Sequence, residues 1–183
     1  MKNLSLDEIV ERLVGANQPI IAIDGPAGAG KTTLANRIAS RYQGSSITIH
    51  MDDLYGGWQD ALGPHLTRTL VNQILTPVSQ RKAFGYRRYD WLQGRFNEPE
   101  RCNAPELLIL EGVGSGQRAC GKFLTELIWI DIEAEVGLAR VLNRDGDYLR
   151  EEMSVWQFHE RDHFKAENTR DRATIRLDGN LFI

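Results

Sequence analysis

The residues with the clearest chemical meaning form a glycine-rich stretch that leads directly into a helical pattern. The stretch is Gly25-Pro26-Ala27-Gly28-Ala29-Gly30-Lys31-Thr32, which has the spacing G-x-x-x-x-G-K-[ST]. Residues 20–23 before it have the apolar character of a buried strand, and residues 33–39 after it are helical in pattern. Glycines let a backbone wrap a phosphate, and inward N–H groups and a helix N-terminus attract its charge. A turn without a ligand is the alternative, but this order of strand, loop and helix predicts a nucleoside triphosphate site.

The positions of this loop have separate expected roles. The Lys31 ammonium can reach the β- and γ-phosphates, and the Thr32 hydroxyl can hold Mg²⁺. ATP and Mg²⁺ are therefore the expected cofactors. The residues expected to contact ATP are Gly25, Pro26, Ala27, Gly28, Ala29, Gly30, Lys31, Thr32, Thr33 and Arg140.

The composition limits the other function classes. The 183 residues, 42% of them hydrophobic, are enough for one well-packed domain. A net charge of −3 gives no general footprint for nucleic acid, and the apolar runs are too short to cross a bilayer. The start of the chain lacks the apolar core of a secretory signal, and the well-separated Cys102 and Cys120 indicate reduced thiols. We expect a cytoplasmic protein without nucleic-acid or membrane partners, of unknown oligomeric state.

Hydrophobic periodicity predicts one α/β domain over residues 1–183. Its expected parts are an N-terminal helix in 1–16, a strand, phosphate loop and helix in 17–44, an acceptor-site segment in 81–105 and a lid in 140–168. Further strands are expected at 46–50, 107–112, 127–131 and 173–178. Ser5 and Glu8 have the spacing of a capping box, and a helix from His65 to Leu75 is expected to end at Pro77.

Two carboxylates follow the expected strand at 46–50. Asp52 and Asp53 follow it after one residue, Met51, and Tyr55 comes two residues after Asp53. In an open parallel sheet, ligands bind at the carboxyl ends of the strands. An acidic turn that caps the next segment would explain Asp53, whereas the position of Asp52 favours a role in the chemistry.

Aromatic and basic residues alternate between Arg81 and Pro105. The basic ones are Arg81, Lys82, Arg87, Arg88, Arg95 and Arg101, and the aromatic ones are Phe84, Tyr86, Tyr89, Trp91 and Phe96. Such a mixture can bind single-stranded nucleic acid, form a small-molecule pocket or be a solvated loop. In a short segment of an acidic chain, the pocket is the favoured interpretation.

Two buried strands end in an acidic residue that could orient Mg²⁺ through water. Glu111 is followed by a glycine-rich loop, which keeps backbone close to a ligand. Asp131 leads directly into a helix, where ending the strand and capping the helix would explain it. We therefore expect Glu111 to be the metal-orienting residue, with Thr32 as its partner.

Two further patterns lie in the helical C-terminal part. Arg140 and Arg144 share a helix face and could close over the phosphates, although each could equally be a surface residue. His159-Glu160-Arg161-Asp162-His163 matches the H-E-x-x-H zinc signature. No third ligand follows at a recognised spacing, so we expect an ordinary helix there and no metal.

Taken together, these motifs resemble the uridine kinase-like branch of the P-loop nucleoside and nucleotide kinases. The matching segments are the phosphate loop, Asp52-Asp53-Leu54-Tyr55, Tyr89-Asp90-Trp91, Glu111-Gly112, and the lid sequence from Leu138 to Asp145. The resemblance implies a three-layer α/β P-loop fold whose five-stranded parallel sheet has the order 2-3-1-4-5. It also implies Lys31, Asp52 and Arg144 as catalytic residues, with Asp52 as the base. The acceptor would lie against Tyr55, Tyr89, Asp90 and Trp91.

The chain departs from that family at the nucleobase contacts. The histidine that follows the family's Y-D-F segment falls on Gly94, and residues 58–62 lack its histidine-containing acidic segment. The expectation is thus ATP-dependent phosphoryl transfer to a small-molecule hydroxyl, most simply that of a nucleoside. The alternatives are a nucleoside monophosphate kinase, a kinase for a non-nucleoside compound, and an ATP-binding regulator with weak hydrolysis.

Overall fold

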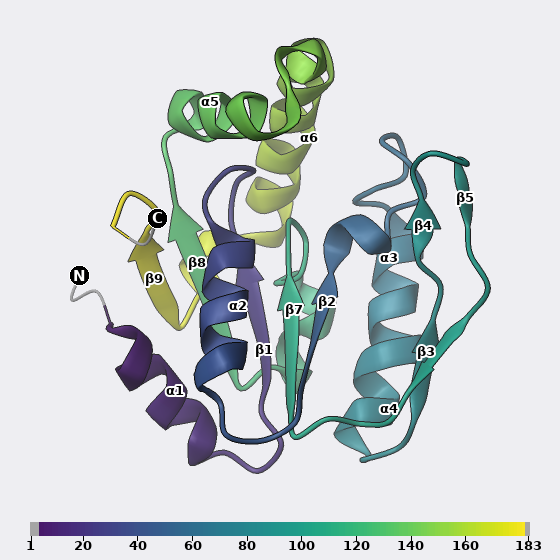
Figure 1. The fold of residues 1–183 in the computed structure, drawn as a ribbon, viewed down its shortest axis with the longest axis vertical. Coiled ribbons are helices and arrows are strands. Elements are labelled where there is room, and N and C mark those ends of the chain that lie inside the picture. Colours follow the sequence, from purple (N-terminus) through teal and green to yellow (C-terminus); the bar gives the residue numbers. More distant parts are fainter. Residues whose placement is uncertain (1–3, 182–183) are drawn as a thin grey trace.

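Five parallel strands form the centre of the molecule, in the order β2-β7-β1-β8-β9 (Figure 1). The computed structural model describes residues 4–181. The strands of this sheet are β1 (Ile20–Asp24), β2 (Ser46–His50), β7 (Leu107–Glu111), β8 (Glu126–Asp131) and β9 (Ile175–Asp178). Because β7, β8 and β9 are the third, fourth and fifth of these strands along the chain, the expected order 2-3-1-4-5 is confirmed.

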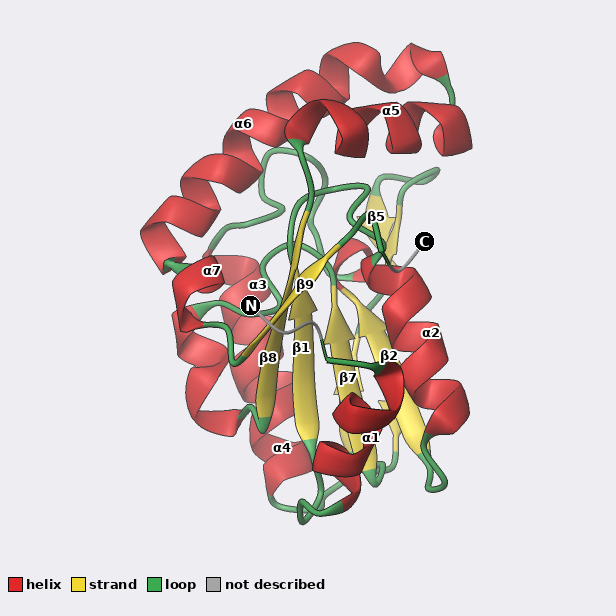
Figure 2. Cartoon of the chain, turned by 90° about the vertical axis from the view of Figure 1, so that its left-hand side faces the viewer, coloured by secondary structure: helices red, strands yellow, loops and turns green. Residues whose placement is uncertain are grey.

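The sheet is buried on both faces, which explains why its strands are continuous apolar runs. Along β1, Ile21 and Ile23 pack on the side of α1 (Leu6–Val14) and α2 (Lys31–Arg41). Ile20 and Ala22 face the other side, where α3 (Pro64–Arg68) and the segments that follow it cover the sheet. Figure 2 shows the edge of this three-layer arrangement. The expected capping box is present at the start of α1, between Ser5 and Glu8.

The expected helix end at Pro77 is wrong. The helix of α3 continues as a π-helical stretch, Thr69–Leu75, and then as α4 (Thr76–Ser79). Pro77 is the second residue of α4, and Leu75 and Thr76 before it keep helical backbone angles. The wider π-helical turns before it allow the chain to pass the proline without ending the helix.

Short antiparallel strands occupy the segment 81–105. β3 (Phe84–Tyr86) pairs with β6 (Glu100–Cys102), and between them β4 (Tyr89–Asp90) pairs with β5 (Arg95–Phe96) as a hairpin. The buried Phe84 and Tyr86 join the core on the α3 side. This segment therefore forms a side wall of the molecule rather than an open surface loop.

The remaining helices lie beyond and beside the carboxyl edge of the sheet (Figures 1 and 2). They are α5 (Ala134–Asp145), α6 (Arg150–Glu167) and the single turn α7 (Thr169–Arg172). Together α5 and α6 occupy most of the expected lid segment. Among the helices within residues 4–181, none is both long and apolar enough to cross a membrane.

Candidate active site

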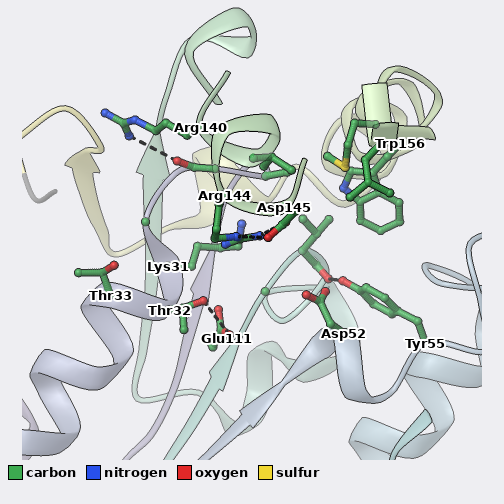
Figure 3. Close-up of a pocket in the computed structure, with 18 of the residues that line it drawn as sticks. Lys31, Thr32, Thr33, Asp52, Tyr55, Glu111, Arg140, Arg144, Asp145 and Trp156 are labelled. Carbon is green, nitrogen blue, oxygen red and sulfur yellow. Dashed lines mark hydrogen bonds and ion pairs between the residues drawn. The ribbon is translucent and has the colours of Figure 1, made fainter. Parts of the chain in front are cut away.

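A cavity of about 470 Å³ opens at the carboxyl edge of the sheet, below α5 and α6 (Figure 3). The glycine-rich loop between β1 and α2 forms one side of it, with Gly28, Gly30, Lys31 and Thr32 on the wall. Asp52 and Glu111, at the ends of β2 and β7, line it from below. The topology thus places the predicted phosphate loop and the predicted carboxylates around one space.

The side chain of Lys31 is held in position by the glycine-rich loop. Its Nζ donates to the carbonyl oxygens of Gly25 at 2.8 Å and Pro26 at 2.7 Å. A lysine with a fixed head group at the start of a helix provides a localised positive charge. This geometry is the one expected for a site that binds phosphate groups.

The loop also touches the backbone of α5, and a glycine lies on each side of this contact. A Cβ on Gly28, whose φ is +77°, would lie 2.2 Å from the carbonyl oxygen of Gly137 in α5. A Cβ on Gly137 would lie 2.5 Å from the carbonyl oxygen of Ala27. Only glycine permits this approach. The loop and the first turns of α5 therefore form one packed unit.

Asp24, the last residue of β1, connects the loop to a second glycine-rich segment. Its fully buried carboxylate accepts from the N–H groups of Gly25 at 2.8 Å, Gly114 at 3.2 Å and Gly116 at 2.8 Å. Burial raises the pKa of Asp24 to about 6, although these hydrogen bonds and the Lys31 ammonium act in the opposite direction. The segment after Glu111 is thereby fixed beside the phosphate loop.

Glu111 is the centre of a small polar cluster. Its Oε1 accepts a hydrogen bond from the Thr32 hydroxyl at 3.2 Å and contacts Nδ1 of His50. The bond to Glu111 raises the pKa of the His50 imidazole. Thr32 and Glu111 were the predicted metal residues, and they are neighbours here.

Asp52 lies across the cavity from the loop, in the 3-10 turn Met51–Asp53 (Figure 3). Its side chain is open to the cavity, but the surrounding walls displace much of its hydration. This desolvation and the negative charge of Glu111 raise the pKa of Asp52, against the effects of Lys31 and Arg144. A carboxylate with a raised pKa next to a phosphate site has the properties of a general base.

Mg²⁺ fits this set of groups. The Thr32 hydroxyl and the Glu111 carboxylate are neighbouring hard oxygen donors on the cavity wall, and the negative charges of Glu111 and Asp52 repel each other. A cation bound by Thr32 and Glu111 would relieve that repulsion. Within residues 4–181, no three or more histidine, cysteine or acidic side chains are grouped so that they could hold a metal ion.

The side of the cavity beyond Asp52 is aromatic. Tyr55, Trp58, Trp91 and Trp156 lie on it, and Trp58 contacts both other indoles, with ring centroids 5.3 Å from Trp91 and 5.7 Å from Trp156. The Trp91 indole N–H donates to the carbonyl oxygen of Asp52 at 3.0 Å. The Tyr55 hydroxyl donates to Val113 at 2.7 Å, and burial raises its pKa well above the usual value, so it stays protonated.

The other predicted acceptor residues lie beside the cavity. Tyr89 packs edge-on against Trp91 at 5.2 Å, and Asp90 accepts from the N–H groups of Leu92 and Gln93 in the hairpin turn. Of the segment 81–105, only Trp91 is on the cavity wall. The basic side chains of this segment are directed elsewhere, and Arg88, for example, pairs with Asp53 and Glu100.

The two lid arginines differ in their surroundings. Arg144 lies above Lys31 with its guanidinium paired to Asp145 by two bonds of 2.7 Å (Figure 3). Arg140 extends to the other side of the loop, where it donates to the carbonyl oxygens of Gly28 and Gly179 and to Asn180. Both line the cavity, but the negative charges of Asp52 and Glu111 act on Arg144, where they help to raise its pKa.

Asp131 has a different environment from Glu111. Burial alone would raise the pKa of Asp131, but hydrogen bonds from Arg170 at 2.7 Å and from Trp129 at 2.8 Å lower it. It is absent from the cavity wall. Of the two candidate metal-orienting acids, the geometry favours Glu111.

The H-E-x-x-H segment is part of α6 and contains no metal cluster within the described chain. His159 is exposed, and His163 packs beside Gly114. Glu160 between them is buried against the phosphate loop, where it accepts from the Ala27 N–H group at 3.0 Å. The expectation of an ordinary helix without a metal site stays a prediction.

Several residues of the site were not predicted from the sequence. Trp58, Trp156, Met153 and Leu149 are on the cavity wall, and Asp24 and His50 support it. Asp24 directly precedes the first glycine of the motif, so an acidic residue at the end of a buried strand was the available signal. The wall residues of α6 belong to an amphipathic pattern that looks like ordinary core.

The comparisons with known proteins agree with this geometry. A family model described as the NB-ARC domain matches residues 2–56, which include the glycine-rich loop. The chain is 28% identical over 144 residues to a uridine kinase of Brevibacillus brevis, covering 70% of this chain and 67% of the relative. It is 26% identical over 148 residues to a uridine kinase of Staphylococcus haemolyticus, covering 71% and 70%.

The fold is also similar to that of a solved structure from this group. A solved structure described as a possible uridine kinase from Bacillus stearothermophilus superposes with a TM-score of 0.67 at 17% identity, covering 94% of this chain and 97% of that one. The P-loop fold and the resemblance to uridine kinases are thereby confirmed. These similarities support a nucleotide-binding P-loop kinase, without determining the molecule that it phosphorylates.

Replacing Gly137 by alanine tests the contact between the loop and α5. The added Cβ would meet the Ala27 carbonyl at 2.5 Å, so the loop or the helix must shift. We expect Gly137→Ala to weaken ATP binding at least about tenfold, a loss of about 1.4 kcal/mol. Calorimetric titration with ATP measures it. Ala139→Gly in the same helix is the control, and equal binding by Gly137→Ala and the wild type would contradict the contact.

The carboxyl group of Asp24 predicts a pH dependence of stability. Its folded pKa of about 6 lies above its unfolded value, so its contribution is complete below pH 4 and is lost as the pH rises through 6. Asp24→Asn presents an amide to the Gly116 N–H group and should lower stability by about 2 kcal/mol. Between pH 5 and 7.5, however, the free energy of unfolding of Asp24→Asn should fall by about 1 kcal/mol less than that of the wild type.

Urea unfolding at the two pH values measures both effects. The Asp131 carboxylate has a lowered pKa, so Asp131→Asn should not reduce the loss of stability between pH 5 and 7.5. If Asp24→Asn loses as much stability over this interval as the wild type, then Asp24 is ionised throughout it and the prediction is wrong.

Proposed function

We propose that this protein is an ATP-dependent kinase that transfers the γ-phosphoryl group of ATP to a hydroxyl group of a small molecule. The first candidate for this acceptor is a nucleoside. The observation that carries the proposal is the position of Asp52, which faces Lys31 and the phosphate loop across one cavity. A carboxylate at that position has no evident use in a protein that only binds ATP. It has one in a kinase, where the acceptor hydroxyl must lose a proton.

The transfer step follows from the residues present. The acceptor oxygen would attack the γ-phosphorus as the bond from that phosphorus to the bridging oxygen of ADP breaks, and the hydroxyl proton would pass to Asp52. The raised pKa of Asp52 suits this role, because a carboxylate with a higher pKa accepts a proton more readily. The hydrogen bond from the Trp91 indole N–H to the Asp52 carbonyl oxygen would hold the backbone of Asp52 in place.

Positive charge is needed where the phosphoryl group moves. Lys31 would bind the β- and γ-phosphates, and Arg144 would exchange its bond with Asp145 for the transferring group. When bound, Mg²⁺ on Thr32 and Glu111 would neutralise phosphate charge. Arg140, bonded to the other side of the loop, would contribute to ATP binding.

The cavity favours an acceptor without a phosphate group. Its cationic side chains are Lys31, Arg140 and Arg144, all on the ATP side, while the acceptor side presents aromatic and apolar groups with the acidic Asp52. A nucleoside monophosphate would need a cation there to bind its phosphate. The exposed faces of Trp58 and Trp91 suit a flat ring or the apolar face of a sugar. A non-nucleoside hydroxyl compound therefore remains the second candidate.

An ATP-binding regulator is the alternative from another class. The NB-ARC match supports only the nucleotide site, because it ends at residue 56. Of the acceptor wall, the aromatic side of the cavity, it leaves out Trp58, Trp91 and Trp156. The aromatic wall beyond Asp52 favours the kinase, since a regulator needs no second small-molecule site.

Incubation with ATP, Mg²⁺ and a panel of nucleosides, nucleoside monophosphates and small hydroxyl metabolites tests the proposal. We expect one class, the nucleosides first, to gain the mass of one phosphate. Asp52→Asn should lower kcat by about 10²–10⁴-fold with ATP binding retained, because it removes the base. Lys31→Ala should lose ATP binding and transfer together.

Asp53→Asn is the matched control, because Asp53 pairs with Arg88 outside the cavity and should keep most of the activity. Phosphorylation of monophosphates alone would favour the monophosphate kinase. ATP binding without any transfer, unchanged by Asp52→Asn, would favour the regulator.

A further inference from the structure

Glu160 is a buried acidic residue that the proposed transfer step does not use. It lies in the middle of α6 and is only 4% exposed. Its Oε2 accepts a hydrogen bond from the main-chain N–H of Ala27, inside the phosphate loop, at 3.0 Å. Burying a carboxylate is costly unless it has partners, and here the hydrogen-bond partners are a main-chain N–H group of the phosphate-binding loop and the side chain of Trp156.

The same face of α6 also reaches the acceptor wall. Met153, Trp156 and Glu160 follow one another at intervals of three and four residues, which places them along one side of a helix. The first two line the cavity, and Trp156 contacts Tyr55 and Trp58 there. One rigid helix therefore touches the acceptor wall with two side chains and the phosphate loop with the third.

We propose that Glu160 is a positioning residue that fixes α6 to the phosphate loop through the Ala27 N–H group and so couples ATP binding to the placement of the acceptor wall. The part that concerns the loop needs only that the loop binds ATP. The part that concerns the acceptor wall rests on the proposed function.

The charges around Glu160 favour such coupling. Lys31 attracts the carboxylate, the Asp24 carboxylate repels it, and the Tyr55 phenol and Trp156 indole lie close to it. Burial, partly offset by Lys31 and the Ala27 bond, raises the pKa of Glu160 to about 7. A bound triphosphate would share the Lys31 charge and add negative charge, so Glu160 should then take up a proton near neutral pH.

Two substitutions separate the hydrogen bond from the charge. Glutamine at 160 keeps an oxygen that can accept from Ala27, whereas alanine removes it. We expect Glu160→Ala to weaken binding of ATP alone about tenfold and Glu160→Gln to stay within about threefold of the wild type. Glu152→Ala, at an exposed position of the same helix, is the matched control and should bind ATP normally. Calorimetric titration without an acceptor measures all four proteins.

The amide of Ala27 gives a second measurement that does not need the alanine variant to fold. In ¹H–¹⁵N spectra of the wild type, its resonance should move with pH with a midpoint near 7 and lie unmoved in Glu160→Gln. Normal ATP binding by a folded Glu160→Ala would overturn the proposal, as would an Ala27 resonance that titrates equally in both proteins. Neither measurement uses an acceptor, so a failed substrate panel leaves the test of Glu160 intact. A wild type that does not bind ATP at all would refute the proposed function itself.

Discussion

A buried carboxylate at the end of the central strand determines how the loops of this protein meet. Asp24 accepts hydrogen bonds from Gly25, at the start of the phosphate loop, and from Gly114 and Gly116, in the loop after β7. Main-chain N–H groups that are buried need acceptors, and here one side chain serves three of them. Because β1 and β7 are neighbours in the sheet, this carboxylate fixes two loops from adjacent strands in a single arrangement. Lys31, Thr32 and Glu111 have defined relative positions as a consequence.

The site built on this arrangement separates charge by side. Positive groups and glycine N–H groups gather at the phosphate loop and α5, whereas Asp52 and Glu111 gather at the ends of β2 and β7. The repulsion between the two carboxylates is tolerated because Lys31, Arg144 and His50 lie close to them. A bound cation would relieve this repulsion, and a perturbed pKa such as that of Asp52 is typical of functional sites.

Much of the fold and the phosphate side of the site could be predicted from the sequence, because their signals are local. A glycine-rich motif between a strand and a helix defines its own geometry, and buried parallel strands are recognisable apolar runs. The aromatic side of the cavity could not be predicted in the same way, because its residues meet through long-range contacts. Trp58 and Trp156 meet only because a loop after β2 and a helix near the C-terminus pack together. Tyr89 and Asp90 matched a motif, yet Asp90 serves the hairpin turn. The end predicted at Pro77 failed because a π-helical stretch changes what a proline does to a helix.

Helices α5 and α6 make contacts with the phosphate loop that no sequence pattern predicted. Arg140 on α5 donates to the Gly28 carbonyl, and Glu160 on α6 accepts from the Ala27 N–H group. Adjacent residues of one loop are therefore held by oppositely charged side chains from two helices. A movement of either helix must break a charge-assisted hydrogen bond or pull on the loop, and such bonds are stronger than those between neutral groups. The phosphate loop is thus the point at which α5, α6 and the sheet are joined. For this reason, the group bound in that loop can influence the aromatic wall, although the wall itself lies on the other side of the cavity.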